Sequence, residues 1–164
     1  MPARRDPVGP GQESVWDYPR PPSALVTPRH VLVELGGQVV ADTRRAIRVC
    51  ETSHPPTYYV PPDDVLPGIL RPARSGSICE WKGQAIYWDV VLGDEVIPGV
   101  AWSYPSPTPA FAVLKGHLAF YAAPFDHCTV DGEMVMPQPG PFYGGWITSR
   151  IAGPFKGVPG SHGW

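Results

Sequence analysis

The residues that could do chemistry are concentrated between Cys79 and Tyr104, where a cysteine and a lysine stand three positions apart among large aromatic side chains. A nearby ammonium group stabilises a thiolate, so Lys82 could activate Cys79 as a nucleophile or redox centre. Lys82 could also act alone, as a fixed positive charge or a Schiff-base amine in a pocket walled by Tyr87, Trp102 and Tyr104. The alternative is structural, with Cys79 as a small buried residue and the Lys82 ammonium in solvent.

Two histidines are candidates for a general base, because imidazole titrates near neutral pH. His54 and His117 both lie among polar and aromatic residues, and either could pair with Cys79 as a thiol catalyst. Each could equally be a structural histidine. No Cys or His pair has the spacing of a zinc finger, so we expect no metal ion, and we expect no cofactor.

Other residues complete the set of candidate ligand contacts. Arg45, between Arg44 and Arg48, could help to clamp an anion, although clustered arginines are also typical of a solvated face. Asp131 and Glu133 could pair for acid–base chemistry, but their spacing also suits a turn with solvated charges. Five aromatic residues could face a ligand or fill the core: Tyr58, Tyr87, Trp102, Tyr104 and Tyr121.

These side chains need β-hairpins to position them. Gly36-Gly37 separates two β-branched runs at 30–35 and 38–42, and only glycine takes positive φ at both turn positions without strain. A central hairpin is predicted over 84–92 and 95–104, with a bulge or edge at Pro98-Gly99. The remaining expected elements are strands at 46–50, 57–60, 117–121 and 129–134, a helical turn at 63–66, an irregular loop at 71–77 and a short helix over 106–114.

Composition and length favour a single, mainly β domain. Gly and Pro account for 41 of 164 residues (18 plus 23), which disfavours long helices. The length suits one hydrophobic core. We therefore expect a small antiparallel β-sheet sandwich or tent-like domain with one or two short helices and irregular Pro/Gly-rich termini.

The chain is expected to divide into three parts. Residues 1–28 form a Pro-rich arm that we expect to lack regular structure, although 15–19 should lie along the domain surface because exposed aromatic rings are costly. Residues 29–136 form the β-rich core. Residues 137–164 form a Gly/Pro tail whose many aromatic side chains argue against a disordered linker.

Charge and cysteine content bear on partners and location. A net charge of −2 gives no electrostatic reason to expect nucleic acid or an anionic membrane as partner. No apolar run approaches the roughly 18 residues that span a bilayer, and no apolar stretch follows the first arginines. The three cysteines contain no CxxC pair, which suits a reducing compartment, so we expect a cytoplasmic protein.

Six motifs occur in order over about residues 30–135: the hairpin at 30–42, ETxHPPxYYxP from Glu51, CxxKGxAxYW from Cys79, AWxYP from Ala101, GHxAFY from Gly116 and VDGE from Val130. As a set they resemble the domain of unknown function 427 family, which is sometimes labelled nucleotidyltransferase-like. The resemblance implies a small β-rich fold without an established reaction. Many members have proline after the motif cysteine, where this chain has Glu80, so the local turn is left open.

The nucleotidyltransferase label finds no support in the residues. Nucleotidyl transfer needs carboxylates that hold Mg²⁺ and a Gly-rich or basic cradle for phosphates. The glycine pair at 36–37 belongs to a hairpin, no GxxxxGK[ST] motif occurs, and Asp63-Asp64 lies beside prolines in a predicted surface turn.

Three function classes follow, in order of preference. The first is an enzyme or binding domain for a small polar or anionic organic molecule held against the central hairpin. The second is a thiol-based catalyst centred on Cys79. The third is a non-catalytic interaction module whose aromatic tail packs onto itself or onto a second copy, as in a homodimer.

Overall fold

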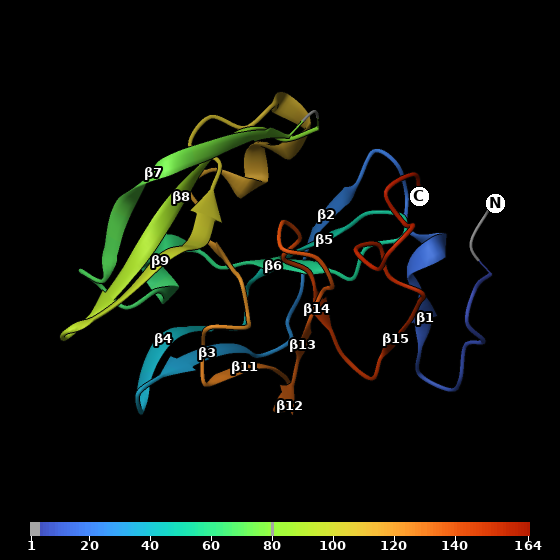
Figure 1. Ribbon diagram of the computed structural model, residues 1–164, viewed down its shortest axis with the longest axis horizontal. Coiled ribbons are helices and arrows are strands. Elements are labelled where there is room, and N and C mark those ends of the chain that lie inside the picture. The colour runs from blue at the N-terminus through green and yellow to red at the C-terminus, as the bar shows by residue number, and fades with distance from the viewer. Residues whose placement is uncertain (1–3, 80) are drawn as a thin grey trace.

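The protein is mainly β, as predicted (Figure 1). Its structure is a computed structural model that describes residues 4–79 and 81–164, apart from the side chains of 75–78. Within the described residues, the strands form several small sheets and helical structure is confined to short 3-10 segments. These segments are η1 (Val15–Asp17), η2 (Pro62–Asp64) and η3 (Pro109–Leu114).

Two four-stranded antiparallel sheets enclose the larger core, which is the expected sandwich-like arrangement (Figure 1). Val33, Val90 and Phe120 come from different strands of the two sheets and are almost fully buried in one cluster. In order across the first sheet, the strands are β10 (Ala119–Phe120), β9 (Glu95–Ser103), β8 (Gly83–Leu92) and β7 (Leu70–Cys79). Across the second they are β12 (Glu133–Met134), β11 (His127–Val130), β3 (Val31–Leu35) and β4 (Gln38–Thr43).

Both predicted hairpins are confirmed. Gly36 and Gly37 have φ of 58° and 76° in the turn between β3 and β4. The central hairpin pairs β8 with β9, and its register shifts beside Pro98-Gly99, where the Gly99 amide donates to Asp89 Oδ1 at 2.7 Å. On the far side of this shift Trp102 pairs with Tyr87 of β8.

The irregular loop predicted at 71–77 is wrong, because this segment belongs to β7 and pairs with β8. Its sequence lacks the alternation of apolar residues that marks a half-buried strand. The register shifts between Pro72 and Gly76, the two residues that weaken a strand locally. Pairing with the edge of β8 overrides the weak local preference of the segment.

A third, three-stranded sheet lies between the other two and positions much of the smaller core (Figure 1). Its strands are β2 (Ser23–Val26), β5 (Ile47–Cys50) and β6 (Thr57–Tyr59), which confirms the predicted strands at 46–50 and 57–60. The prediction that residues 1–28 lack regular structure is wrong, because β2 pairs fully with β5 and η1 buries Val15. Backbone pairing with a core strand compensates for the high proline content around β2.

The tail folds onto its own chain. β13 (Met136–Pro137) pairs with β14 (Trp146–Ile147), and β15 (Ile151–Ala152) runs parallel to β1 (Glu13–Ser14). The Trp146 indole is 2% exposed, and its Nε1 donates to the Phe120 carbonyl at 3.0 Å. The loop between β13 and β14 is thereby fixed across the end of the three-stranded sheet.

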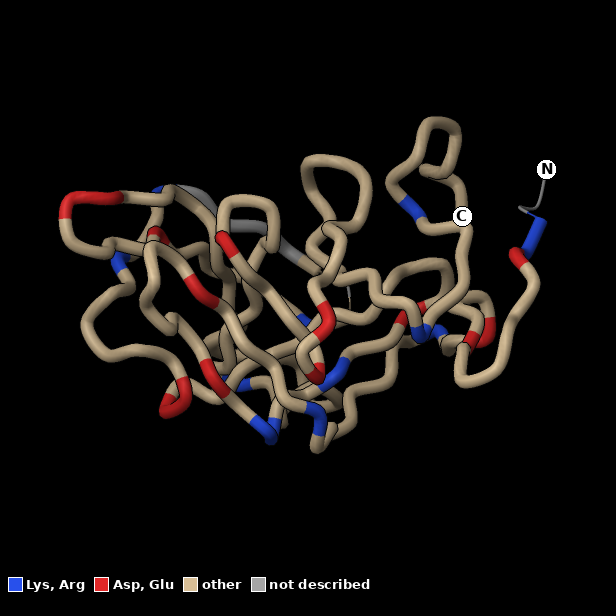
Figure 2. Tube along the Cα trace, turned by 90° about the horizontal axis from the view of Figure 1, so that it is seen from below, with Lys and Arg blue, Asp and Glu red and all other residues tan. Residues whose placement is uncertain are grey.

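Charged positions of both signs are interspersed along the trace (Figure 2). No helix among the described residues combines the length and the apolar character needed to cross a membrane.

Candidate functional site

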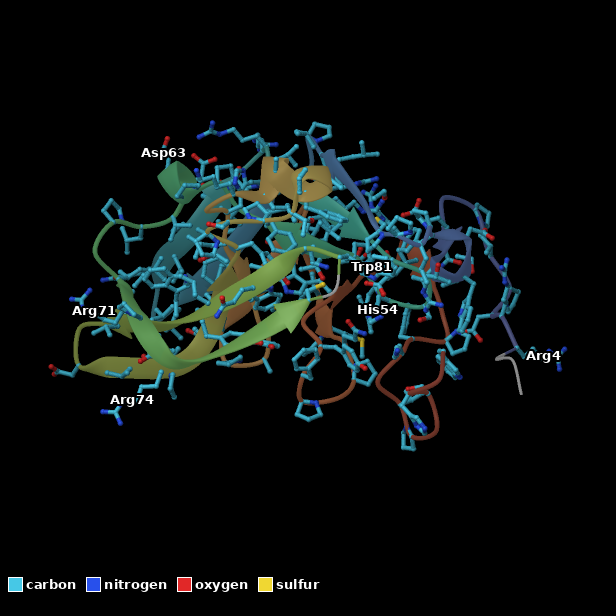
Figure 3. All side chains as sticks on the ribbon, turned by 90° about the horizontal axis from the view of Figure 1, so that it is seen from above. Arg4, His54, Asp63, Arg71, Arg74 and Trp81 are labelled. Atoms are coloured by element: carbon cyan, nitrogen blue, oxygen red, sulfur yellow. The ribbon has the colours of Figure 1, made fainter. Side chains whose placement is uncertain are left out.

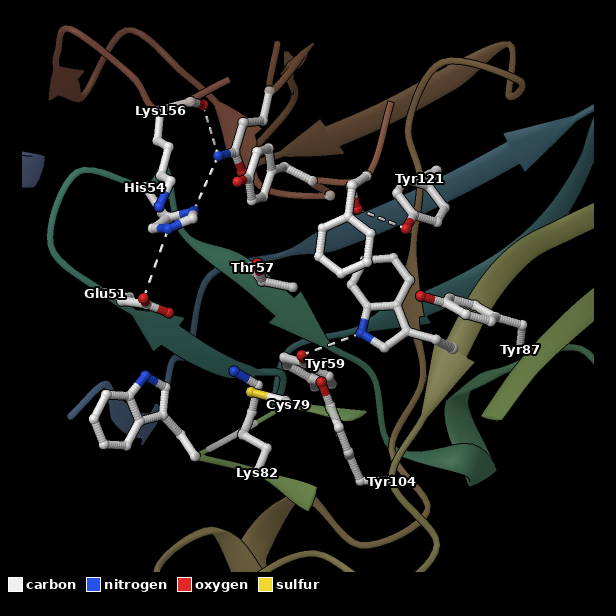
Figure 4. A pocket seen from close by; sticks show the side chains of 16 residues that line it. Glu51, His54, Thr57, Tyr59, Cys79, Lys82, Tyr87, Tyr104, Tyr121 and Lys156 are labelled. Carbon is white, nitrogen blue, oxygen red and sulfur yellow. Dashed lines mark hydrogen bonds and ion pairs between the residues drawn. The ribbon is translucent and has the colours of Figure 1, made fainter. Parts of the chain in front are cut away.

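A cavity of about 310 Å³ lies where β6, β8 and β9 meet the tail (Figure 4). Figure 3 places Trp81 and His54 together near this region, while Arg71 and Arg74 lie toward the far end of the central sheet. The described lining is contributed by Glu51, His54, Thr57, Tyr59, Cys79, Trp81, Lys82, Tyr87, Trp102, Tyr104, Tyr121, Gln138, Phe142, Tyr143, Gly144 and Lys156.

One wall is aromatic and internally bonded. Trp102 Nε1 donates to the Tyr59 hydroxyl at 3.3 Å, and the ring centroids of Trp102 and Tyr121 are 4.7 Å apart. The Tyr121 hydroxyl donates to the Phe142 carbonyl at 2.8 Å. Burial raises the pKa of Tyr59, Tyr104 and Tyr121, so all three remain neutral phenols near pH 7. This wall offers flat apolar faces rather than charge.

Lys82 supplies a positive charge at the edge of the smaller core. Its side chain is only 8% exposed, and its Nζ lies 5.9 Å from the Tyr104 ring centroid and 5.8 Å from that of Phe111. No carboxylate among the described residues forms an ion pair with it. A cation in such surroundings favours binding of an anion that would replace lost hydration.

The turn that presents Lys82 is anchored from outside the hairpin. Gly83 has a φ of 107°, which strongly favours glycine. The Thr108 amide donates to the Lys82 carbonyl at 3.0 Å, and the Thr108 hydroxyl donates to the Trp81 carbonyl. The start of η3 therefore fixes the direction of the β7–β8 turn.

A strained turn presents His54. Ser53 is fully buried and has a φ of 72°, unusual for a residue with a Cβ. Its amide donates to the Val15 carbonyl at 3.1 Å, and its carbonyl accepts from the Lys156 amide at 2.8 Å. The arm and the tail thus stabilise a conformation that the turn would rarely adopt alone.

His54 lies between Gln138 and Glu51 (Figure 4). Gln138 Nε2 is 3.0 Å from His54 Nδ1, and His54 Nε2 is 3.6 Å from Glu51 Oε2. Burial, reinforced by the positive charge of Lys156 and more distant cations, lowers the pKa of His54 to about 4. The imidazole is therefore neutral at pH 7 and can donate a hydrogen bond from only one nitrogen.

The loop between β13 and β14 closes the cavity on the side opposite the central hairpin. Gly144 packs so closely on Trp102 that an added Cβ would overlap the indole. The Tyr143 ring meets the His54 ring edge-on, with centroids 5.3 Å apart, and Lys156 Nζ lies 6.0 Å from the Tyr143 centroid. A glycine-rich loop is needed here because the backbone itself forms the wall.

Cys79 is the partly exposed cysteine of the three and lines the cavity, whereas Cys50 and Cys128 are buried elsewhere. Burial raises the pKa of Cys50 to about 11 and that of Cys128 to about 12, so both are unreactive thiols.

The structure brings seven of the ten sequence-predicted site residues to this cavity. They are His54, Cys79, Lys82, Tyr87, Trp102, Tyr104 and Tyr121.

The other three predicted residues lie elsewhere. His117 Nδ1 is 3.1 Å from the Lys115 carbonyl and does not line the cavity. Tyr58 packs on Trp146, with ring centroids 5.7 Å apart, and Arg45 binds Asp64 through Nε and a terminal nitrogen at 3.0 and 3.2 Å.

Sequence reasoning missed the polar residues Glu51, Gln138 and Lys156. Glu51 opens the ETxHPP motif, so its distance of three residues from His54 was a usable signal. Gln138 and Lys156 lie in the tail, where no local pattern indicates a long-range contact.

No group of three or more His, Cys, Asp or Glu side chains in the described part of the chain is arranged to hold a metal ion. The acidic pair at Asp63-Asp64 lies in η2, and Asp64 is bound to Arg45 and Thr43. Asp64 is therefore bound at the surface of the second sheet, and neither carboxylate lines the cavity.

Comparison with protein-family models gives a match to the model described as domain of unknown function (DUF427), over residues 23–131. No curated protein matches the chain. The chain belongs to the DUF427 family, in agreement with the resemblance drawn from its motifs.

Proposed function

We propose that this DUF427-family domain binds a small organic anion that carries a flat, unsaturated or aromatic part, in the cavity between the central hairpin and the tail. The single observation that carries the proposal is the buried Lys82 ammonium beside aromatic rings, with no ion-pair partner among the described carboxylates. A ligand anion would supply a counter-charge to Lys82 while its flat part packs on the aromatic wall.

The charges of the lining support an anion rather than a cation. Lys82 and Lys156 contribute two positive charges, and the Lys156 ammonium also donates to the Trp164 carbonyl at 3.3 Å. Glu51 contributes one negative charge, and His54 is neutral near pH 7. The volume of about 310 Å³ is at the lower end of the range for small-molecule sites, about 300–1,000 Å³. A monocyclic acid suits this space better than a nucleoside triphosphate with its bound metal.

The proposal is tested by titrating 3-phenylpropionate into the full chain by isothermal calorimetry, with intrinsic fluorescence as a second signal because Trp81 and Trp102 line the cavity. Lys82→Met removes the charge and keeps much of the side-chain length, so we expect at least tenfold weaker binding. Lys115→Met is the matched control, because Lys115 is exposed and outside the cavity.

Urea unfolding of both variants verifies that they are folded. Saturable binding by the wild type and Lys115→Met, with loss in folded Lys82→Met, supports the proposal. Equal affinity in all three proteins, or no binding of 3-phenylpropionate to the wild type, contradicts it.

A thiol reaction at Cys79 is the second candidate. It is favoured by one observation, that Cys79 is partly exposed in the same cavity as Lys82. The rate of alkylation by iodoacetamide, measured against pH, tests it. A thiolate titration well below pH 8 that moves upward in Lys82→Met supports activation, whereas a profile like that of a free thiol argues against it.

A further inference from the structure

Both donor directions of the Gln138 side-chain amide and one acceptor direction of its oxygen have partners. Its Nε2 donates to the Lys156 carbonyl at 2.9 Å and approaches His54 Nδ1 at 3.0 Å, and its Oε1 accepts from the Gly145 amide at 3.1 Å. Exchanging the amide oxygen and nitrogen would set oxygen against the Lys156 carbonyl and NH₂ against the Gly145 amide. The two backbone groups therefore fix the orientation of this 5% exposed side chain.

This orientation fixes the tautomer of His54. Gln138 Nε2 donates one hydrogen to the Lys156 carbonyl and directs the other at His54 Nδ1. A proton on Nδ1 would oppose that hydrogen, so Nδ1 accepts it and is unprotonated. In the neutral ring the proton then resides on Nε2, the nitrogen that faces Glu51 Oε2 across 3.6 Å.

Glu51 is the acidic member of the cavity lining. Its side chain is 24% exposed and its partner among the described basic residues is His54. Gln138 donates to His54, and the protonated Nε2 of His54 faces the Glu51 carboxylate across 3.6 Å, which is longer than a hydrogen bond. The imidazole therefore leaves the lone pairs of this carboxylate available to a ligand. A carboxylate in this position, facing the N–H edge of the ring, can accept hydrogen bonds from a ligand but cannot donate them.

We propose that Gln138 is a positioning residue that, through His54, sets the Glu51 carboxylate as the hydrogen-bond acceptor of the cavity, and that the ligand therefore carries a hydroxyl or amino group in addition to its anionic group. This inference rests on the proposed function of the cavity. It narrows the ligand class from simple aromatic acids to hydroxy or amino acids with a flat side chain. Lys82 and the aromatic wall bind the parts that both classes share.

The first test reads the tautomer without any ligand. Nitrogen-15 shifts of the His54 ring at pH 7 distinguish the Nε2–H tautomer, the Nδ1–H tautomer and the imidazolium. We expect Nε2–H in the wild type. In Gln138→Glu the carboxylate becomes an acceptor, so we expect the proton on Nδ1, while Gln138→Met should give a mixture. If Gln138 only fills space, the tautomer of His54 is the same in the wild type and in both folded variants. That result overturns the inference, and so does an Nδ1–H tautomer in the wild type.

The second test compares 3-phenyllactate, as both enantiomers, with 3-phenylpropionate, which lacks only the hydroxyl. We expect at least one enantiomer of phenyllactate to bind about tenfold more tightly to the wild type, the factor that one hydrogen bond to a charged acceptor provides. This ratio should fall to about one in Glu51→Leu. It should stay in Glu95→Leu, because Glu95 is exposed at the start of β9, outside the cavity.

The outcomes separate the two proposals. Tight binding of both acids with equal affinity leaves the proposed function standing and overturns the role of Glu51. If neither acid binds, the proposed function fails, and the tautomer measurement still decides whether Gln138 orients His54. If Glu51→Leu does not fold, the loss of the affinity ratio in Gln138→Met replaces it.

Discussion

Lowering the pH is expected to destabilise this protein through His54 before its carboxylates titrate. The His54 side chain is 17% exposed and faces positive charge from Lys156, Arg20 and Lys82, with Glu51 as the acidic group on its own turn. Burial is the largest cause of its lowered pKa, and the cations add to it. Protonation would also place a hydrogen on Nδ1 against the amide hydrogens of Gln138.

The magnitude follows from the two pKa values. In the unfolded chain His54 titrates near 6.5, and in the folded protein near 4. Between these values the unfolded state binds a proton that the folded state does not, so the free energy of unfolding decreases as the pH falls. One pKa unit is worth about 1.36 kcal/mol, so the full effect is about 3 kcal/mol. It is absent above pH 6.5 and complete near pH 4.

Urea unfolding at closely spaced pH values from 4.5 to 7.5 measures this dependence, with His54→Gln as the matched protein. A glutamine can still accept from Gln138 but does not titrate. The carboxylates of Glu13, Asp64 and Asp131 have lowered pKa values and lose their stabilisation at more acidic pH. Their contribution is common to both proteins and cancels in the difference.

We expect the wild type to lose stability relative to His54→Gln by more than about 1 kcal/mol between pH 6.5 and 5. Parallel profiles over that interval would refute a buried neutral imidazole. A wild type that gains stability relative to the variant on acidification would indicate a raised pKa, set by Glu51 rather than by burial.

Three further predictions concern packing and exposure. Gly144→Ala should lower the free energy of unfolding by about 1–3 kcal/mol, because the new methyl overlaps the Trp102 indole. It should also weaken binding of 3-phenylpropionate. An unchanged urea midpoint would contradict this contact. Under native conditions one thiol, at Cys79, should be labelled by iodoacetamide ahead of the other two, as peptide mass spectrometry would reveal. Arg45→Ala should leave the urea midpoint unchanged, since its ion pair with Asp64 lies in solvent and such pairs contribute little.

The elements predicted best were those defined by local chemistry. Turn glycines at positive φ, the pair Gly36-Gly37 in one hairpin and Gly93 in the other, together with β-branched runs, specify these hairpins without reference to the rest of the chain. The predicted helix at 106–114 was only partly right, since η3 is a kinked 3-10 segment with non-helical geometry at Phe111. Proline and short length leave too few residues for regular α-helical bonding.

The missed strands have a common cause. β2 and β7 both lack a clear apolar period, and both form because a neighbouring strand offers free backbone groups. Such pairing depends on which strand edge lies next to the segment in the folded chain. The sequence of a segment does not show which strand edge it will meet in the fold. For this reason β7 was predicted as a loop and β2 as part of an irregular arm.

The candidate site likewise combines residues that local sequence could predict with contacts that depend on the fold. Lys82, Cys79 and the aromatic residues of the central hairpin were found because they lie close together in the sequence, between Cys79 and Tyr104. The partner of His54 is 84 positions away along the chain, at Gln138, and the contact depends on the tail folding back. Pairings at such separation have no sequence period, so the contribution of Gln138 and Lys156 to the cavity could not be predicted.

The tail is therefore part of both the fold and the site, although it lies beyond the family match at 23–131. Trp146 is buried in the larger core, and the amide of Lys156 binds the carbonyl of the strained Ser53. Any change that loosens the tail should release the Ser53 turn, and with it the direction of His54. The shape of the cavity is consequently coupled to the packing of the tail. The family-matched region contributes Lys82 and Trp102, and the tail adds Gln138, Tyr143 and Lys156 to the lining.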